Sequence, residues 1–179
     1  MIKSLLFSAI VLVSSIQITK ADNHKINPID KKQINVDSLR LVELDQYWTE
    51  LSRTVREGDY DSYKAAYHED AVIVFAAGKN KTSVSISEAL AGWKQGFHDT
   101  KTGKNQNSVV FRFSQRIGNE TTAHETGIFL YTSTDSKGKV LGKSYTHFEM
   151  LFVKLDNVWY ALMEYQKSNG TLDEWKALK

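Results

Sequence analysis

The sequence predicts an α+β domain in which three helices precede and cover a curved antiparallel sheet. Between Leu41 and Phe97, apolar residues recur at three- and four-residue spacing, apart from one short apolar run. They alternate with polar residues from Val109 onward, and turn residues divide this second part into four long strands. With 179 residues, of which 41% are hydrophobic and 25% charged, the chain has the composition of one globular domain with a core.

The first residues have the features of an export signal. Lys3 precedes an apolar run from Leu5 to Val13, and Thr19-Lys20-Ala21 has small residues at the ends of the triplet. This run is too short to span a bilayer, so we expect a cleaved signal peptide over residues 1–21 and a secreted or periplasmic protein without stable membrane insertion. An uncleaved anchor is the alternative.

The charge balance and the absence of cysteine exclude several kinds of site. Loss of residues 1–21 removes Lys3 and Lys20, so 23 basic residues become 21 and equal the 21 acidic residues. A neutral chain lacks a basic surface for nucleic acid, and we expect no such partner. Without cysteine there is no disulfide, thiolate ligand or cysteine nucleophile. We predict neither a metal nor another cofactor.

A flexible leader is predicted over residues 22–38, which are polar and aperiodic, before a domain over residues 39–179. The first helix of that domain can be capped by Asp37 or Ser38 and ends at Gly58. Its apolar positions recur at helical spacing: Leu41, Leu44, Trp48, Leu51 and Val55.

A second, shorter helix follows, capped by Asp59 or Asp61 and ending at His68-Glu69-Asp70. Its predicted buried stripe is Tyr60, Tyr63, Ala66 and Tyr67. His68, Glu69 and Asp70 could be read as metal ligands, but at a helix end such residues are more often surface groups. Residues 71–75 form a short apolar run and predict a buried strand.

The third helix begins with a capping box, Ser85 followed by Glu88. Its stripe is Ile86, Leu90, Trp93 and Phe97. Alternation then predicts strands over residues 109–114 and 123–132, with turns at Gly118-Asn119 and at residues 136–138. A terminal helical turn is expected over residues 172–178.

A hairpin over residues 144–166, with its turn at Asp156-Asn157, is the strongest local signal. Asp and Asn accept the positive φ of a two-residue turn, so Leu155 is expected opposite Val158. This register gives the hairpin one apolar and one mixed face. The apolar face holds Phe148, Met150, Phe152, Trp159, Ala161, Met163 and Tyr165. The mixed face holds Tyr145, His147, Glu149, Leu151, Val153, Tyr160, Leu162, Glu164 and Gln166.

Three motifs resemble the nuclear transport factor 2-like superfamily, over roughly residues 39–166. Residues 53–75 are similar to its helix, Gly-Asp, helix, Tyr-x-x-Asp-Ala-Val start. Residues 123–129, AHETGIF, resemble its Ala-x-Glu-x-Gly-x-aromatic strand, and residues 152–159 resemble its aromatic-x-Lys, turn, Trp hairpin. The resemblance implies a cone-shaped curved antiparallel sheet, covered by three N-terminal helices around a pocket and usually dimeric. The superfamily includes ketosteroid isomerases, SnoaL-like polyketide cyclases, dehydratases and binding-only modules.

The ketosteroid isomerase branch implies that the mixed face is concave and that Glu149 matches the hydrogen-bond-donating acid of those enzymes. Their general base would fall at Phe75 and their phenolic donor near Leu51, and neither side chain can move a proton. The resemblance therefore supports a pocket more than it supports steroid isomerisation.

Acid/base chemistry is also suggested by the predicted register, which places Glu149 opposite Glu164. Two carboxyls in one apolar-walled cavity do not both ionise readily, so one would stay protonated and could donate to a ligand carbonyl. Glu125 joins them if residues 136–138 form a three-residue loop, and lies on the other face if the loop has two residues. His147 is the natural base or proton carrier.

The mixed face could alternatively be solvated, because antiparallel sheets often have one wet face. That arrangement would expose Leu151, Val153, Tyr160 and Leu162 as an apolar patch. We therefore expect helices over the mixed face and a partner subunit over the apolar face, in a homodimer built through Phe148, Met150, Trp159 and Met163.

Together these features predict an exported domain that binds a small apolar or carbonyl-bearing ligand, with acid/base catalysis on a carbonyl compound as a further expectation. The candidate catalytic residues are Glu149, His147 and Glu164. The candidate ligand-binding residues are Glu125, Tyr145, Leu151, Tyr160, Leu162, Gln166, Trp48, Leu51, Trp93 and Phe97. The alternative is a non-catalytic dimerisation or protein-interaction module with a vestigial pocket.

Overall fold

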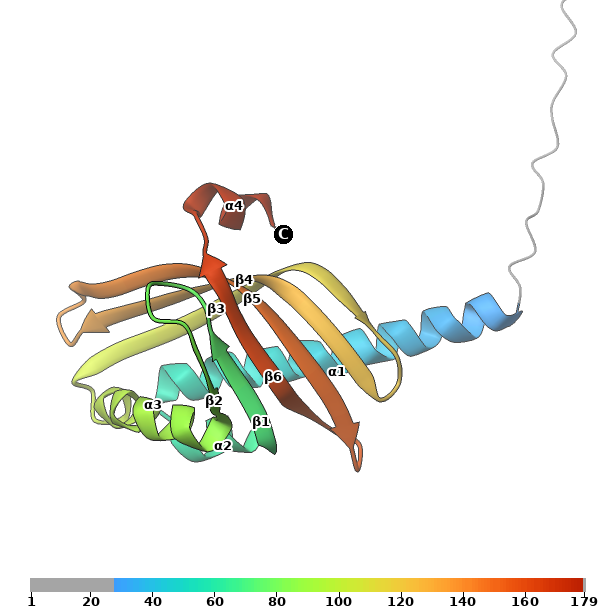
Figure 1. Cartoon of the computed structure of the whole chain (residues 1–179), viewed down its shortest axis with the longest axis horizontal. Coiled ribbons are helices and arrows are strands. Elements are labelled where there is room, and N and C mark those ends of the chain that lie inside the picture. Colours follow the sequence, from blue (N-terminus) through green and yellow to red (C-terminus); the bar gives the residue numbers. More distant parts are fainter. Residues whose placement is uncertain (1–27, 179) are drawn as a thin grey trace, which may run out of the picture.

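A computed structural model describes residues 28–178 and shows a curved six-stranded sheet with helices packed on it (Figure 1). The predicted signal peptide and its cleavage site lie outside the described residues. No described helix is long and apolar enough to cross a membrane. The elements are, in order, α1 (Pro28–Glu57), α2 (Tyr60–Ala65), β1 (Tyr67–Phe75), β2 (Thr82–Ser85), α3 (Ile86–Lys101), β3 (Asn105–Gly118), β4 (Thr122–Asp135), β5 (Val140–Leu155), β6 (Val158–Asn169) and α4 (Leu172–Ala177).

The α+β class and the long meander β3–β6 are confirmed, and the sheet is mixed rather than wholly antiparallel. The strand order is β2-β1-β6-β5-β4-β3. β1 runs parallel to β6, whereas every other neighbouring pair is antiparallel. β1 thereby extends the sheet past β6 and brings the N-terminal helices over the same concave face.

Two helix boundaries differ from the sequence prediction. α1 begins at Pro28 rather than at Asp37, so residues 28–38 of the predicted leader are helical. Proline is favoured at the first position of a helix, where its missing N–H has no intrahelical partner. α2 ends at Ala65, so His68, Glu69 and Asp70 belong to strand β1 instead of a helix end.

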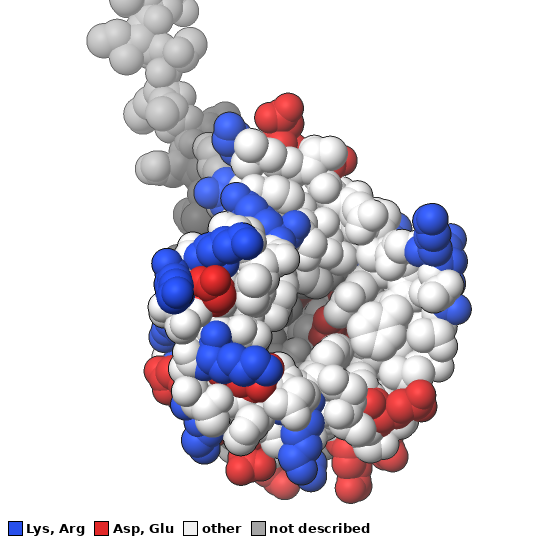
Figure 2. Space-filling view, turned by 90° about the vertical axis from the view of Figure 1, so that its left-hand side faces the viewer, with Lys and Arg blue, Asp and Glu red and all other residues white. Residues whose placement is uncertain are grey.

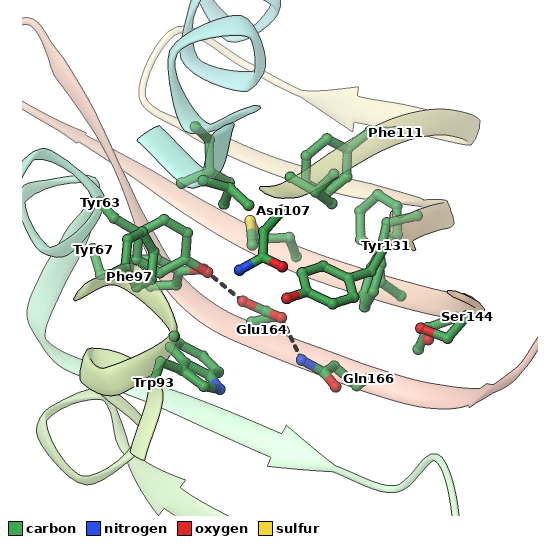
Figure 3. A pocket seen from close by; sticks show the side chains of 18 of the residues that line it. Tyr63, Tyr67, Trp93, Phe97, Asn107, Phe111, Tyr131, Ser144, Glu164 and Gln166 are labelled. Carbon is green, nitrogen blue, oxygen red and sulfur yellow. Dashed lines mark hydrogen bonds between the residues drawn. The ribbon is translucent and has the colours of Figure 1, made fainter. Parts of the chain in front are cut away.

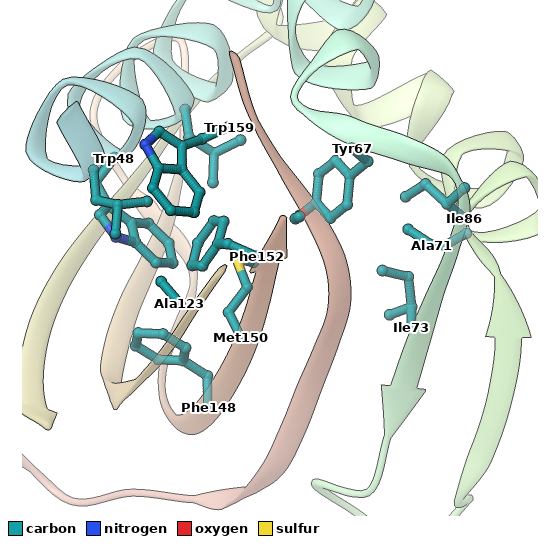
Figure 4. Packing of buried hydrophobic residues seen from close by; sticks show 14 of the residues in the cluster. Trp48, Tyr67, Ala71, Ile73, Ile86, Ala123, Phe148, Met150, Phe152 and Trp159 are labelled. Atoms are coloured by element: carbon teal, nitrogen blue, oxygen red, sulfur yellow. The ribbon is translucent and has the colours of Figure 1, made fainter. Parts of the chain in front are cut away.

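The core lies between α1 and the concave face of the sheet (Figures 1 and 4). Trp48 of α1 packs edge-to-face or tilted against Phe148 and Phe152 of β5, with ring centroids 5.5 Å apart in both pairs. Phe148, Met150 and Phe152 are each at most 2% exposed. Burial of side chains of this size contributes about 1.5–3 kcal/mol each. α4 lies on the opposite face, where Trp175 contacts Tyr145.

The β5–β6 turn has the predicted geometry. Asp156 and Asn157 have φ of 49° and 64°, and Leu155 pairs with Val158. The register then shifts, because Phe152 pairs with Ala161 but Leu151 pairs with Met163, which leaves Leu162 as an extra residue in β6. One inserted residue turns the following side chains of a strand to the other face.

This bulge makes the predicted Glu149–Glu164 pair wrong. Glu164 pairs with Met150, and Glu149 pairs with Tyr165. The assignment of the two faces is also wrong, because the apolar side chains of β5 are the ones under the helices. Glu164 and Gln166 join that concave face, while Glu149, His147 and Leu151 lie on the convex face.

The predicted dimer contact is contradicted by the same packing. Phe148, Met150 and Trp159 are buried within their own chain, at 2%, 2% and 6% exposure. Met163 pairs with Leu151 on the convex side. These four residues therefore cannot form a common surface for a second subunit, and whether the chain forms a homodimer is not tested by the structure of one chain.

Candidate functional site

A cavity of ≈ 460 Å³ lies between α3 and the concave face of the sheet. It appears as a hollow in the face drawn in Figure 2, with an acidic group visible inside it. Among the residues that the structure describes, Glu164 is the one Asp or Glu that lines the cavity. The other lining residues are mostly apolar or aromatic: Leu51, Val55, Tyr63, Tyr67, Gly92, Trp93, Gly96, Phe97, Thr100, Asn107, Val109, Phe111, Phe129, Tyr131, Ser144, Thr146, Phe148, Met150 and Gln166.

Regular spacing in each element places these side chains. In α3, Trp93 and Phe97 are four residues apart and share a helix face. Gly92 and Gly96 of the same helix also line the cavity, and a Cβ added at either position would meet no atom within 4 Å. The missing side chains therefore leave room on the α3 side. On the sheet side, alternate residues of β3 and β5 point inward.

Glu164 is held at the sheet wall of the cavity by two neutral donors (Figure 3). The Tyr67 hydroxyl donates to Oε2 at 2.5 Å, and the Gln166 amide Nε2 donates to Oε1 at 2.8 Å. The Tyr63 hydroxyl lies 3.1 Å from that of Tyr67, which extends the network to α2. Glu164 itself is 7% exposed.

Burial governs the protonation of this network. Desolvation raises the pKa of Glu164 above its ordinary value, and the hydrogen bonds from Tyr67 and Gln166 offset only part of the increase. Burial, followed by the nearby Glu164, also raises the pKa of Tyr63 and of Tyr67. Both phenols thus remain protonated at physiological pH, and Glu164 is the carboxyl of the network that can exchange a proton.

A second polar group in the cavity has an unused acceptor. Asn107 near the start of β3 donates from Nδ2 to Oγ1 of Thr100, in the last turn of α3, at 2.7 Å. Its Oδ1 is buried and accepts no hydrogen bond, and the residue is 8% exposed. Buried polar atoms are nearly always hydrogen-bonded, so this oxygen indicates a missing partner in the cavity.

The structure brings five of the sequence-predicted site residues together. Glu164, Gln166, Leu51, Trp93 and Phe97 all line the cavity. Leu51 comes from α1, Trp93 and Phe97 from α3, and the two polar residues from β6. The bulge at Leu162 turns Glu164 and Gln166 inward. The sequence did not predict this bulge.

Two further candidates, Trp48 and Glu125, are buried beside the cavity without lining it. Trp48 Nε1 donates to Glu125 Oε2 at 2.5 Å, and Arg116 Nε donates to Oε1 at 2.7 Å. Arg116 also contacts Asp45 of α1 at 2.5 Å. Both Glu125 oxygens thus have partners within the chain, and the carboxylate joins α1 to the sheet.

The remaining candidates lie away from the cavity. Glu149 contacts Lys167 at 2.8 Å and His124 at 3.4 Å, and the hydrogen bond from Lys167 holds the pKa of Glu149 below its usual value. His147 faces Glu174 of α4 at 3.4 Å. Tyr145 contacts the Trp175 ring, and Tyr160 contacts the His68 ring. None of these residues, nor Leu151 or Leu162, lines the cavity.

Several lining residues were missed by sequence reasoning, above all Tyr67 and Asn107. Tyr67 was assigned to a helix but lies in β1, where it faces Glu164. Asn107 has a detectable signal, because it precedes Val109 and Phe111 at two-residue spacing and so shares their strand face. No set of three or more His, Cys, Asp or Glu side chains within residues 28–178 is arranged to hold a metal ion.

Comparison with known proteins finds similarity in structure only. No protein-family model matches the chain, and no curated protein matches it. A conserved protein from Planctomyces limnophilus superposes with a TM-score of 0.61 at 13% identity, over 74% of this chain and 98% of that one. An NTF-2-like protein of unknown function from Shewanella oneidensis gives 0.55 at 16% identity, over 70% and 97% of the two chains.

A third similar structure contains a ligand. It is a protein from Catenulispora acidiphila in complex with S-DNPA, with a TM-score of 0.53 at 15% identity, covering 74% of this chain and 94% of that one. These similarities show the fold: the chain has the nuclear transport factor 2-like fold that its sequence motifs predicted.

Proposed function

We propose that this chain binds a small, largely apolar molecule in the cavity and anchors it through Glu164. The observation that carries the proposal is a buried carboxylate, without a basic partner among the described residues, inside an aromatic-lined cavity. Buried Glu side chains are rare unless they are paired. An unpaired carboxylate at a buried position does not stabilise the fold by packing, so we infer that it binds a ligand.

The size and lining of the cavity support this proposal. A volume of ≈ 460 Å³ is within the range of about 300–1,000 Å³ of small-molecule sites, which are mostly apolar with few polar groups. Eight aromatic side chains and a handful of polar ones fit that description. The fold neighbour from Catenulispora acidiphila, solved with S-DNPA, adds a bound small molecule within the same fold.

Proton transfer within the cavity would be carried out by Glu164. His147 and Glu149 lie on the convex face, so the acid/base chemistry that we expected from three residues reduces to one. Glu164 can accept a proton as a carboxylate and donate it as an acid, because burial raises its pKa in the direction of neutral pH. Acid/base catalysis by this residue is part of the proposal, as is export of the chain through the signal over residues 1–21.

Filling the cavity tests the binding function. Thr146 of β5 lines the cavity and is 6% exposed, so Thr146→Phe should place a ring in it, whereas Thr146→Val keeps the shape and serves as control. The neutral dye prodan should bind wild type and the Val variant with a blue-shifted emission, and should bind the Phe variant at least tenfold more weakly. Equal binding by all three proteins, or no binding by wild type, would contradict the proposal.

A further inference from the structure

We propose that the ligand is an amine, held as its ammonium ion between the Glu164 carboxylate and the Asn107 side-chain oxygen, with its apolar body against the aromatic walls. This inference rests on the proposed binding function and specifies the chemical class of the ligand. It depends on three features of the cavity, namely its free acceptors, its aromatic surface and its charges.

The polar groups at the site leave acceptors unused. An ionised carboxylate has about four acceptor positions, and Glu164 uses one on each oxygen, for Tyr67 and Gln166. Asn107 Oδ1 accepts nothing. In Figure 3 the Asn107 amide and the Glu164 carboxylate both project into the cavity. An ammonium group carries three N–H donors and no acceptor, which complements such a site.

Aromatic rings provide the second feature. Tyr63, Trp93 and Phe97 form a cluster on the α2–α3 side, with ring centroids 5.8 Å apart for Tyr63 and Trp93 and 4.9 Å apart for Tyr63 and Phe97. All three line the same cavity as Glu164. Ring faces attract cations, by about 0.5–2 kcal/mol each depending on desolvation.

The charges around Glu164 favour a cation as well. No Lys, Arg or His contributes to the lining from α1, α2, α3 or strands β1 and β3–β6. The titratable groups that face the carboxyl are the phenols of Tyr47 on α1, Tyr63 on α2 and Tyr67 on β1, and all three have raised pKa values, chiefly through burial. They remain neutral, so a bound ammonium ion would be the counter-ion that none of the described residues provides at this position.

A carbonyl ligand is the competing possibility, and it makes the opposite demand on Glu164. A carbonyl oxygen needs a protonated carboxyl as donor, whereas an ammonium ion needs the carboxylate. Both Glu164 oxygens accept from neutral donors, which is the arrangement that stabilises the ionised form. A carbonyl would also leave Asn107 Oδ1 without a partner.

Matched probes distinguish these cases. Naphthylethylamine and naphthylacetone share an aromatic body and differ in the polar group. Titration calorimetry can measure the affinity of the protein for each of them. We expect the amine to bind at least tenfold more tightly at about pH 8, where it is still protonated like a lysine side chain. Its affinity should rise with pH as Glu164 ionises. Ketone affinity should be flat or fall as pH rises.

Three variants assign the preference to the site. Glu164→Gln should remove the preference for the amine and its pH dependence, and Asn107→Leu should weaken amine binding severalfold with little effect on the ketone. Glu149→Gln, the same change on the convex face of the hairpin, is the control and should leave both affinities unchanged. Thermal unfolding of each variant confirms that it is folded.

The outcomes separate the inference from the function on which it rests. Equal or tighter ketone binding, abolished by Thr146→Phe, overturns the amine inference and leaves the binding function standing. An amine preference that persists in Glu164→Gln also overturns it. If neither probe binds, or if Thr146→Phe leaves binding unchanged, the proposed function fails and the inference fails with it.

Discussion

Glu164 and Glu149 show how strongly the surroundings of a carboxyl decide its contribution to stability. They lie on neighbouring strands of one hairpin, but Glu164 is buried against neutral donors and Glu149 contacts Lys167 and His124. Their pKa values consequently move in opposite directions, upward for Glu164 and downward for Glu149. Opposite shifts give opposite dependences of folding stability on pH.

Replacing each residue by glutamine should reveal this contrast. The folded chain holds the Glu164 proton more tightly than the unfolded chain, so wild type loses stability as pH rises from about 4.5 through the folded pKa. Glu164→Gln lacks that loss, and its stability relative to wild type should increase with pH. Glu149 contributes stability above its unfolded pKa and loses it in acid, so the deficit of Glu149→Gln should be largest near neutrality and shrink in acid.

Urea unfolding at a series of pH values, about 4 to 8, measures both differences. Parallel pH curves for wild type and Glu164→Gln would show that the carboxyl has the same pKa in the folded and unfolded chains. That result would remove the desolvation argument for this residue, whichever ligand the cavity takes.

Helix caps and turns, which depend on local residues, were predicted from the sequence. The bulge in β6, which depends on pairing between strands, was not. The Ser85 side chain accepts a hydrogen bond from the Glu88 backbone N–H, as expected for the start of α3. The Asp156-Asn157 turn has its predicted register. The bulge at Leu162 has no such local signal, because Leu162 continues the alternation of β6 without interruption. The parallel pairing of β1 with β6 also shifts register at this position, so the bulge depends on long-range pairing.

The same distinction explains the outcome for the candidate site. Leu51, Trp93 and Phe97 follow from helical spacing, which a sequence displays directly. Glu164 lines the cavity, although it was chosen through a pairing with Glu149 that does not exist. Asn107 was not chosen, because it precedes the strand predicted from Val109, and an amide at such a place resembles a turn residue until its missing partner is seen.

The positive φ of Asn157 in the β5–β6 turn can be tested by substitution. Asn157 has φ of 64°, a conformation that glycine adopts freely and that β-branched residues avoid. Asn157→Gly should keep or slightly raise the free energy of unfolding, whereas Asn157→Val should lower it by about 1–2 kcal/mol. Chemical denaturation measures both changes. A valine variant as stable as wild type would mean that the turn readily adopts another geometry.

For the molecule as a whole, the cavity gathers features that lower stability. Gly92 and Gly96 sit in the middle of α3, Asn107 Oδ1 is buried without a partner, and Glu164 is buried without a cation. Each is unfavourable for folding, by roughly 1 kcal/mol for a helical glycine and about 1–3 kcal/mol for an unsatisfied buried acceptor. They occur at one place in an otherwise well-packed domain, and such local violations concentrate at functional sites.

Restoring helix propensity should therefore stabilise the fold. A Cβ at Gly92 or Gly96 meets no atom within 4 Å, so Gly92→Ala combined with Gly96→Ala should raise the free energy of unfolding by about 1–2 kcal/mol. Ala91→Gly, at an exposed position of the same helix, should lower it by about 1 kcal/mol. Urea denaturation gives both values. A double variant less stable than wild type would mean that α3 needs its glycines for close packing. The glycines would then not be evidence that the fold loses stability to leave room for a ligand.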